Sequence, residues 1–363
     1  MTTHIFEDAA PSPLAPRRTL RDVARLAGVS VSTASMALAD KSRVSASTKQ
    51  AVRQAAAALS YVPNSSGRAL RAQRVGALAV VVPHTSHHVF THPVFMDLLE
   101  GITAAANEHG VTTILSTAPA EHDEAPAYLR ILEGRQADGV IVASASVRDQ
   151  NVDRLAASGY PVTLVGRRPH RPSLHCVGID DLGGFQALTE HLLGAHGHRR
   201  LAHIAGPLDH QSAIDKHEGF RAALAQAGVA YDPSLVVESD YSQEGGHAAA
   251  LELLEGPALD AIVAANDQMA FGAIEAMRDH GLDAPRDLAV VGYDDIGLAR
   301  VMHPQLTSVC ADLVEVGRLA AERLLELMAG KQPQPVQREL PTTVIVRASC
   351  GCPPERIQRG TTA

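Results

Sequence analysis

The strongest constraint on the fold is an alternation of short apolar runs with stretches of helical periodicity, which begins at Gly76. The apolar runs include GALAVVV, VTTILS, DGVIVAS, YPVTLVG, RLAHIAG, DAIVAAN and LAVVGYD. The helical stretches include FMDLLEGITAAANEHG, GFRAALAQAG and MAFGAIEAMRDHG. Strands and helices in alternation predict parallel sheets with helices on both faces. So many elements exceed one sheet of ordinary size, and we therefore expect two similar α/β lobes.

The N-terminal part of the chain differs from this body in charge. Residues 17–74 contain eleven Lys and Arg against Asp22 and Asp40, a net charge of +9. Residues 75–363 sum to −15, within a total of −8 for the 363 residues. A basic head on an acidic body indicates that the head binds a polyanion. Charge alone leaves a merely solvated basic face as an equal alternative.

Periodicity in the basic head predicts three short helices. The first, over about 20–27, begins with a capping-box pattern of Thr19 and Asp22 and ends at Gly28. Ser30 can cap the second helix after a tight turn. Four residues are expected to face inward from that helix: Val31, Ala34, Ser35 and Leu38.

The third helix begins after Val44, which can act as a hydrophobic staple, with Ser45 or Ser47 as the cap. Its apolar face follows at helical spacing: Val52, Ala55, Ala56 and Leu59. Three such helices form an all-α helix-turn-helix unit, and the stretch GVSVSTASMALA contains its recognition helix. An uncharged helix with short hydroxyls and methyls suits the major groove, while the surrounding arginines bind phosphates. An ordinary helical hairpin is the alternative reading of this pattern taken alone.

At this point the sequence resembles the lactose-repressor (LacI) family of bacterial transcription regulators. The run TLRDVARLAGVSVSTASMALADKSRVSASTKQAVRQAAAALSYVPNSSGRALR is similar to the DNA-binding signature of that family. The similarity continues through GHRRLAHIAGP, AANDQMAFGAIEAM, DLAVVGYDDI, PQLTSV and VIVRAS, and so covers about residues 19–350. The resemblance implies a two-lobed core like that of periplasmic binding proteins, with a small-molecule effector between the lobes.

The resemblance also implies which residues contact double-stranded operator DNA. The candidates are Thr19, Val31, Ser32, Thr33, Ser35, Met36, Asn64, Arg68, Leu70 and Arg71. Val31, Ser32 and Met36 occupy base-reading positions, and the family most often has arginine where this chain has Met36. Methionine cannot donate the bidentate hydrogen bonds that select guanine, so we expect a different base pair there.

The segment PNSSGRALRAQR, residues 63–74, matches the hinge of the family. So short a helix, with Gly67 inside it, is marginal in water and is expected to form only when DNA and a partner subunit hold it. In the family, a leucine at the position of Leu70 enters the minor groove between base steps. Composition alone would classify this segment as an interdomain linker.

For the effector, Asp294 in VGYDD and Asn266 with Asp267 in AANDQ follow apolar runs, where the family places ligand-binding groups. Each can instead cap the next helix, and we expect Asp267 to be a cap rather than a ligand. Ile214 stands where the family usually has an arginine, so either Lys216 replaces that cation or the site is more apolar. Phe95, or else Phe90, could stack on a sugar ring.

The effector-binding candidates are therefore Phe95, Ile214, Lys216, Asn266 and Asp294. Residues 84–92 contain four histidines, which suggests a metal site or a pH sensor, although such a stretch is more often solvated. The last two cysteines form a lone Cys-Gly-Cys without a second cysteine pair. We expect thiols, no metal and no cofactor.

We expect a disordered tail over 1–18, the DNA-binding domain over 19–62, the hinge over 63–74, the effector-binding and dimerisation core over 75–350, and a flexible tail over 351–363. No signal peptide or membrane span is evident, and we expect a cytoplasmic protein. No signature of an enzyme is found. The C-terminal tail lacks a leucine heptad, which favours a homodimer.

The predicted function is that of a repressor released from its operator by a small molecule, most simply a carbohydrate. A regulator with the opposite coupling, for which a nucleobase or another metabolite is the corepressor, shares the same fold. A solute-binding protein with a nonspecific basic appendage is a third reading. The sign of the change in DNA affinity separates the first two.

Overall fold

The computed structural model describes residues 18–38, 40, 42–61, 75–120 and 123–353. The chain divides into two compact units, Met1–Arg74 and Val75–Ala363. The expected hinge over 63–74 lies outside the described residues, as do most of the two expected tails. Four DNA-binding candidates lie in that hinge and are likewise not described: Asn64, Arg68, Leu70 and Arg71.

The described part of the N-terminal unit contains three helices: α1 (Leu20–Leu26), α2 (Val31–Leu38) and α3 (Ala46–Ala58). The Asp22 carboxylate accepts hydrogen bonds from the backbone N–H and the hydroxyl of Thr19, which fixes the start of α1. Ser45 caps α3 by accepting from Thr48 N. The core of the unit consists of Val23, Ala24, Ala34, Ala37, Val44, Val52, Ala55 and Ala56. The three predicted helices are confirmed.

The inward face predicted for α2 is partly wrong. Ala34 and Ala37 are buried, whereas Val31 is 41% exposed. Val31 is the first residue of α2, so its side chain extends beyond the contact of this helix with α1 and α3. Ala37 is small enough to let α2 approach the other two helices closely.

In the second unit, the N-terminal lobe is built on a parallel six-stranded sheet of order β11-β5-β4-β3-β1-β2. The strands are β1 (Ala77–Thr85), β2 (Thr112–Ala118), β3 (Gly139–Val142), β4 (Val162–Val165), β5 (His175–Ile179) and β11 (Gln337–Leu340). The helices of this lobe are α5 (Ser86–Thr91), α6 (Val94–Glu108), α7 (Ala125–Gly134), α8 (Gln150–Ala157) and α13 (Leu313–Met328).

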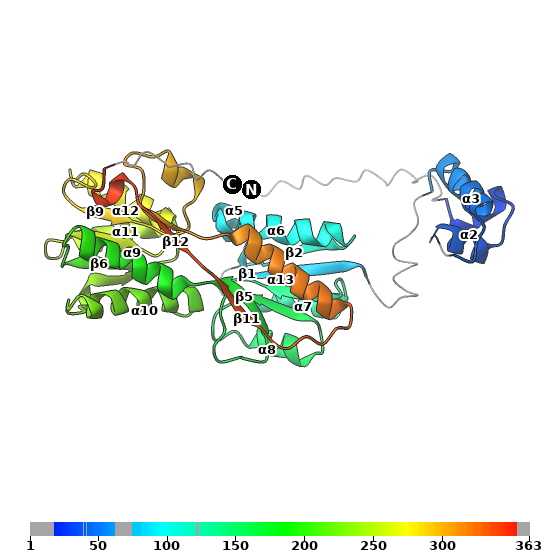
Figure 1. Ribbon diagram of the computed structural model, residues 1–363, viewed down its shortest axis with the longest axis horizontal. Coiled ribbons are helices and arrows are strands. Elements are labelled where there is room, and N and C mark those ends of the chain that lie inside the picture. The colour runs from blue at the N-terminus through cyan, green and yellow to red at the C-terminus, as the bar shows by residue number, and fades with distance from the viewer. Residues whose placement is uncertain (1–17, 39, 41, 62–74, 121–122, 354–363) are drawn as a thin grey trace, which may run out of the picture. The chain divides into compact units, whose positions relative to one another are not determined.

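Strand β1 shows why these strands are continuously apolar. Leu78, Val80 and Val82 pack in the cluster formed with α6 and α13. Ala79 and Val81 pack in the opposite cluster, formed with α7 and α8. Successive side chains of a strand point to opposite faces, so both faces of the sheet are buried under helices (Figure 1).

The C-terminal lobe has a parallel four-stranded sheet of order β7-β6-β8-β9 and a two-stranded antiparallel sheet of β10 and β12. The strands are β6 (Leu201–Ala205), β7 (Val236–Glu238), β8 (Ala261–Ala264), β9 (Ala289–Val291), β10 (Ser308–Cys310) and β12 (Thr343–Ile345). The helices are α9 (Asp181–Ala195), α10 (Gln211–Gln226), α11 (Gln243–Leu254) and α12 (Asp267–Asp279). Three short 3₁₀ turns complete the lobe: η1 (Pro233–Leu235), η2 (Gly297–Arg300) and η3 (Ala348–Cys350).

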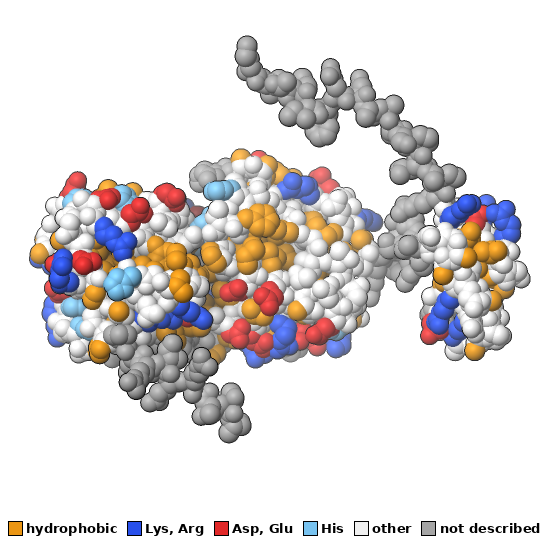
Figure 2. Space-filling view, turned by 90° about the horizontal axis from the view of Figure 1, so that it is seen from above, with side chains coloured by type: hydrophobic (Ala, Val, Ile, Leu, Met, Phe, Trp, Pro, Cys, Tyr) orange, Lys and Arg blue, Asp and Glu red, His pale blue; other side chains and the backbone are white. Residues whose placement is uncertain are grey.

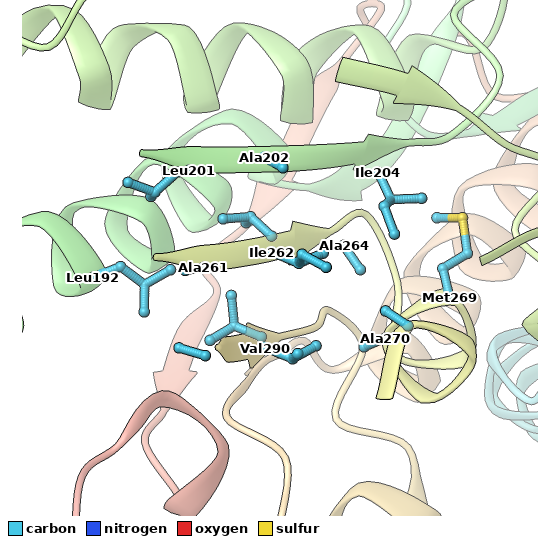
Figure 3. Close-up of a cluster of buried hydrophobic side chains, with 14 of the residues drawn as sticks. Leu192, Leu201, Ala202, Ile204, Ala261, Ile262, Ala264, Met269, Ala270 and Val290 are labelled. Carbon is cyan, nitrogen blue, oxygen red and sulfur yellow. The ribbon is translucent and has the colours of Figure 1, made fainter. Parts of the chain in front are cut away.

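Figure 3 shows the core of this lobe, where Ile204, Ile262 and Val290 come from three adjacent strands and Met269 from α12. Between Val75 and Pro353, in the residues that the structure describes, the chain passes between the lobes three times, from β5 to α9, from β10 to α13 and from β11 to β12. The expected α/β architecture of two similar lobes is confirmed. In the described residues, no helix is long and apolar enough to span a bilayer.

Candidate functional site

The N-terminus of α2 presents a group of hydroxyls on the surface. Ser30 caps the helix by accepting from Thr33 N at 3.1 Å, and its hydroxyl also lies 2.8 Å from the hydroxyls of Ser32 and Thr33. Ser32 is exposed, and Ser35 and Thr33 are partly exposed. Met36 is 37% exposed and lies on the same helix, four residues after Ser32. The exposed surface of α2 thus combines short polar groups with Val31 and Met36, as contact with base edges requires.

Lys and Arg side chains form separate patches on the visible face of this unit (Figure 2). Some are engaged in ion pairs, since Lys49 and Arg53 both contact Asp40, and Arg25 contacts Asp22. In the described part of the unit, no ion pair includes Arg18, Arg21 or Arg43. These three guanidinium groups are available for phosphates, which position a recognition helix on a duplex without reading its sequence.

A second candidate site is the inter-lobe cavity of about 190 Å³, which is lined by both lobes of the second unit. Its polar lining includes Arg167, Arg168, Asp181, Lys216, Tyr241, Asn266 and Asp294. A larger hollow of about 490 Å³ runs beside α13, but only the N-terminal lobe lines it. Charged side chains from separate elements converge on the inter-lobe cavity, as is typical of a ligand site.

Lys216, on α10, is the buried cation of the inter-lobe cavity. Its Nζ donates to the backbone oxygen of Ala265 at 3.0 Å, lies 3.6 Å from the Asp181 carboxylate and lies 3.8 Å from the ring centre of Tyr293. Burial alone lowers the pKa of Lys216, but the Asp181 and Asp294 carboxylates outweigh burial and raise it. Lys216 is therefore protonated, and it is the charge that permits two carboxylates to lie in this cavity.

Asp294 follows β9 and has a backbone φ of +101°, a conformation that a residue with a side chain rarely adopts. Strain of this kind persists only where the surrounding structure enforces it, and it is concentrated at functional sites. Burial raises the pKa of the Asp294 carboxyl to about 7, although Lys216 opposes this shift. Burial likewise raises the pKa of Asp181 to about 6. Both carboxylates line the cavity and can accept hydrogen bonds from a ligand.

The helix cap at the start of α12 differs from the prediction. Asn266, not Asp267, is the N-cap: its Oδ1 accepts from Met269 N at 2.8 Å. Its Nδ2 donates to the backbone oxygen of Tyr241 at 2.9 Å, so both ends of the amide are already in use, although Asn266 lines the cavity. Asp267 is buried, accepts from the Ser308 hydroxyl and from Ile296 N, and is not part of the cavity lining.

The remaining effector candidates fall into two groups. Phe95 and Lys216 line the inter-lobe cavity. Ile214 and Phe90 do not, and Phe90 is 62% exposed. Helix geometry explains why Lys216 lines the cavity and Ile214 does not. The two residues are two positions apart on α10, so their side chains point in different directions. The cation of this site is therefore Lys216, two residues after position 214, where the family usually has an arginine.

Arg167 and Asp215 form a salt bridge between the lobes, which the sequence did not reveal. The Arg167 Nε donates to Asp215 Oδ2 at 3.0 Å, and a second nitrogen of the guanidinium contacts Oδ1. Arg167 follows β4 in the N-terminal lobe, whereas Asp215 is on α10 in the C-terminal lobe and its side chain is 4% exposed. The neighbouring Arg168 is buried, lines the cavity and has no hydrogen-bond partner for its Nε in the described structure.

The histidine-rich stretch also differs from expectation, because part of it forms α5 and three of its four side chains are stacked, while His87 is exposed. The rings of His84 and His88 are 4.4 Å apart, those of His88 and His92 are 4.0 Å apart, and His84 also stacks on His210 of the other lobe at 5.4 Å. Burial lowers the pKa of His84 to about 4 and that of His88 to about 3. These two imidazoles are neutral at physiological pH, which argues against a pH sensor in that range.

We expect Arg167→Met to lower the free energy of unfolding of the second unit by roughly 1–3 kcal/mol, because the buried Asp215 carboxylate loses its bidentate partner. Urea unfolding monitored by circular dichroism measures this change. Arg171→Met is the matched control, since Arg171 pairs with Asp153, which is 55% exposed. An exposed pair of this kind contributes little. Equal losses in the two variants would show that the bridge between the lobes has no special role.

The two units together define a class of protein: a helix-turn-helix DNA-binding module joined to a two-lobed ligand-binding core. The family model for bacterial regulatory proteins of the lacI family matches residues 19–64. The model for periplasmic binding proteins and the sugar-binding domain of the LacI family matches residues 76–349. The chain therefore belongs to the LacI family of transcriptional regulators.

Individual relatives match along almost the whole chain. The HTH-type transcriptional regulator CelR of Thermobifida fusca is 36% identical over 338 residues, which are 92% of this chain and 98% of that protein. The HTH-type transcriptional regulator DegA of Bacillus subtilis is 30% identical over 336 residues, with the same coverage. These relatives are transcriptional regulators and not enzymes, which confirms the expectation that the chain has no catalytic role.

Two solved structures show the same architecture. A complex of the transcriptional regulator CelR with cellobiose has a TM-score of 0.72 and 34% identity, and the match covers 92% of this chain and all of that one. A Lac repressor dimer bound to operator and the anti-inducer ONPF has a TM-score of 0.81 and 28% identity, and covers 92% of this chain and 99% of that one.

Proposed function

We propose that this chain is a cytoplasmic repressor that binds its operator as a homodimer and releases it when a sugar binds in the inter-lobe cavity. The observation that carries the proposal is that Asp181, Lys216 and Asp294 converge on one cavity. The same chain exposes Val31 and Met36 on α2, the proposed DNA-reading helix. Carboxylates accept hydrogen bonds from hydroxyl groups, and Phe95 adds an aromatic ring for an apolar sugar face.

The charges around the cavity favour an uncharged ligand. Three cations, Arg167, Arg168 and Lys216, are balanced by the carboxylates of Asp181, Asp294 and Asp215. The volume of about 190 Å³ is smaller than the range of roughly 300–1,000 Å³ for drug-sized ligands, which favours a small ligand such as one sugar ring. The cellobiose complex of CelR supports a carbohydrate, and a disaccharide is the larger alternative to test.

The mechanism depends on the position of the effector site between the two lobes of the second unit. A sugar that contacts Asp294 on the C-terminal lobe and Phe95 on the N-terminal lobe stabilises one arrangement of the lobes over others. The DNA-binding units of a dimer must keep a fixed spacing to read two half-sites. A change of lobe arrangement alters that spacing and lowers DNA affinity.

Two linked measurements test the proposal. Thermal-shift screening with monosaccharides, disaccharides and nucleobases identifies the effector, since a ligand at about 100 times its Kd stabilises by roughly 2.7 kcal/mol. Fluorescence anisotropy with an operator selected from a random library then gives DNA affinity with and without that ligand. Operator DNA must weaken sugar binding by the same factor by which the sugar weakens DNA binding. Unchanged sugar affinity at saturating operator contradicts release, and tighter DNA binding with a nucleobase supports the corepressor reading instead.

We expect Met36→Arg to shift the selected operator motif toward guanine at one base pair in each half-site. An arginine can donate two hydrogen bonds to guanine, worth roughly 1–3 kcal/mol of discrimination, or about tenfold to hundredfold. The motif is measured by sequencing the DNA that the variant selects. Met96→Arg is the control, because Met96 is 38% exposed, close to the 37% of Met36, but lies on α6 in the other unit. An unchanged motif for Met36→Arg would exclude Met36 from base reading.

A further inference from the structure

A cluster of four potential metal ligands lies in the C-terminal lobe, away from the inter-lobe cavity. It consists of His191, His196, Cys350 and Cys352, whose ligand atoms all lie within 4.8 Å of one another. His191 is on the last turns of α9, and His196 is the residue that ends this helix. Cys350 is the last residue of η3, which packs against β9, and Cys352 follows two residues later. Elsewhere in the described residues, no other group of His, Cys, Asp or Glu has metal-ligand spacing.

The distances within the cluster match the edges of a metal tetrahedron. The Nε2 atom of His191 lies 3.5 Å from Cys350 Sγ and 3.7 Å from Cys352 Sγ, and His196 Nε2 lies 3.4 Å from Cys352 Sγ. Zinc bonds of about 2.3 Å to sulfur and 2.0–2.1 Å to nitrogen at tetrahedral angles give a nitrogen–sulfur edge of about 3.5 Å. The three measured nitrogen–sulfur distances are therefore already those expected around a bound zinc ion.

The backbone brings the two thiols to the same side of the chain. Gly351, between the cysteines, has a φ of +97°, which a residue with a side chain rarely adopts. Glycine thus permits the turn that presents Cys350 and Cys352 to the same two imidazoles.

Besides the two histidines, Cys350 Sγ has two polar neighbours, the backbone oxygen of Arg347 at 3.3 Å and the hydroxyl of Thr307. The buried Thr307 hydroxyl lies 3.2 Å from Cys350 Sγ, within hydrogen-bond reach, and accepts a hydrogen bond from Arg347 N. Partners of this kind orient the ligands of metal sites.

We propose that His191, His196, Cys350 and Cys352 form a structural zinc site that fastens the C-terminal turn of the chain to the end of α9. Two thiolates and two imidazoles occupy all four positions of a tetrahedron, which leaves no open position for a substrate. The two histidines are separated by four residues, a spacing common in such sites, whereas one residue between the cysteines is shorter than usual. Asp181 of the cavity begins the same helix, roughly 15 Å away at 1.5 Å per residue.

The test uses the full-length chain, purified under reducing conditions and supplied with zinc. We expect about one zinc ion per chain by inductively coupled plasma mass spectrometry. When cobalt(II) replaces zinc, we expect thiolate-to-metal charge-transfer bands in the absorption spectrum. A chelator should lower the melting temperature of this protein, because an ion that binds only the folded state stabilises it. Absence of bound zinc, or a cobalt spectrum without thiolate bands, would overturn the proposal.

Variants separate metal binding from general damage. Cys352→Ser and His196→Gln remove partly exposed ligands and should each weaken cobalt affinity by more than the roughly 10–100-fold loss typical of an outer-shell change. They should also abolish the effect of the chelator on the melting temperature. Cys310→Ser is the matched control, since Cys310 is a partly exposed cysteine outside the cluster, and it should retain wild-type affinity. Equal cobalt affinity in Cys352→Ser and Cys310→Ser would also refute the site.

Discussion

Lys216→Met is expected to lower the free energy of unfolding by about 3–5 kcal/mol, the range observed when one partner of a buried ion pair is removed. The Asp181 and Asp294 carboxylates would remain in the inter-lobe cavity without the cation that lies 3.6 Å from Asp181. At roughly 2–4 °C per kcal/mol, the melting temperature should fall by the order of 10 °C. Methionine keeps the length of the side chain, so lost packing contributes little.

The pH dependence of this loss identifies its cause. Lys216 lowers the pKa of both carboxyls, whose values are nonetheless raised to about 6 for Asp181 and about 7 for Asp294. Without Lys216 both values rise further above the ordinary value of aspartate. A carboxyl with a raised pKa in the folded state takes up its proton as the pH falls, which favours folding. The gap in melting temperature between wild type and Lys216→Met should therefore narrow as the pH falls from 8 toward 5.

Two further variants complete this experiment. Lys331→Met removes an exposed lysine, which lies 3.4 Å from Glu326, and should change stability little. The double variant Lys216→Met/Asp294→Asn should recover part of the loss, because it removes one of the two stranded carboxylates. No recovery, together with a loss that does not depend on pH, would show that Lys216 acts through packing and not through charge.

Much of the fold could be predicted because its strands are buried on both faces. Runs such as GALAVVV and DAIVAAN have few polar residues, since consecutive residues of β1 and β8 are buried and successive side chains point to opposite faces of the sheet. The resemblance to the LacI family nominated Asp294, which follows one of these runs and lines the inter-lobe cavity. The apolar pattern missed β5, whose residues His175, Cys176 and Gly178 do not form such a run. With β5 unrecognised, Asp181 could not be placed at the end of a strand beside Lys216.

Other parts of the two sites depend on contacts that no local pattern records. Arg167 and Asp215 are 48 positions apart, and Cys350 and His191 are 159 apart. The sequence suggested a search for a second cysteine pair, whereas the partners of the Cys-Gly-Cys motif are two histidines at the end of α9. Burial of Asp267 likewise follows from its contact with Ser308 on β10, which cannot be read from the AANDQ segment.

Asp294→Asn is expected to have two opposite effects, a loss of effector affinity and a gain in the stability of the ligand-free protein. A carboxylate that accepts hydrogen bonds from sugar hydroxyls contributes roughly 1.5–3 kcal/mol per bond, so affinity should fall by about tenfold to hundredfold. Asparagine tolerates positive φ better than most residues, so the strained backbone at +101° is retained. Isothermal titration with the identified sugar measures the loss.

The gain in stability follows from the pKa of Asp294, which is about 7 in the folded protein and near 3.8 in its ordinary state. Below the ordinary value the carboxyl is neutral in both states and costs nothing. As the pH rises from about 4 to about 7, the unfolded chain ionises while the folded chain resists, and folding is progressively disfavoured. Asparagine has no such cost, so the excess melting temperature of the variant should grow over this interval and level off above pH 7.

Asp295→Asn is a control with the opposite expected sign, at the adjacent position. Asp295 is buried and contacts both Arg300 and Arg347, so its ionised form is paired. Neutralising it leaves the Arg347 guanidinium without its carboxylate and should lower the melting temperature. If both variants were destabilised alike, Asp294 would be an ordinary buried carboxylate. A higher melting temperature for Asp294→Asn and a lower one for Asp295→Asn would instead show that the Asp294 carboxylate destabilises the ligand-free protein. Ligand binding would then be the interaction that compensates for this cost.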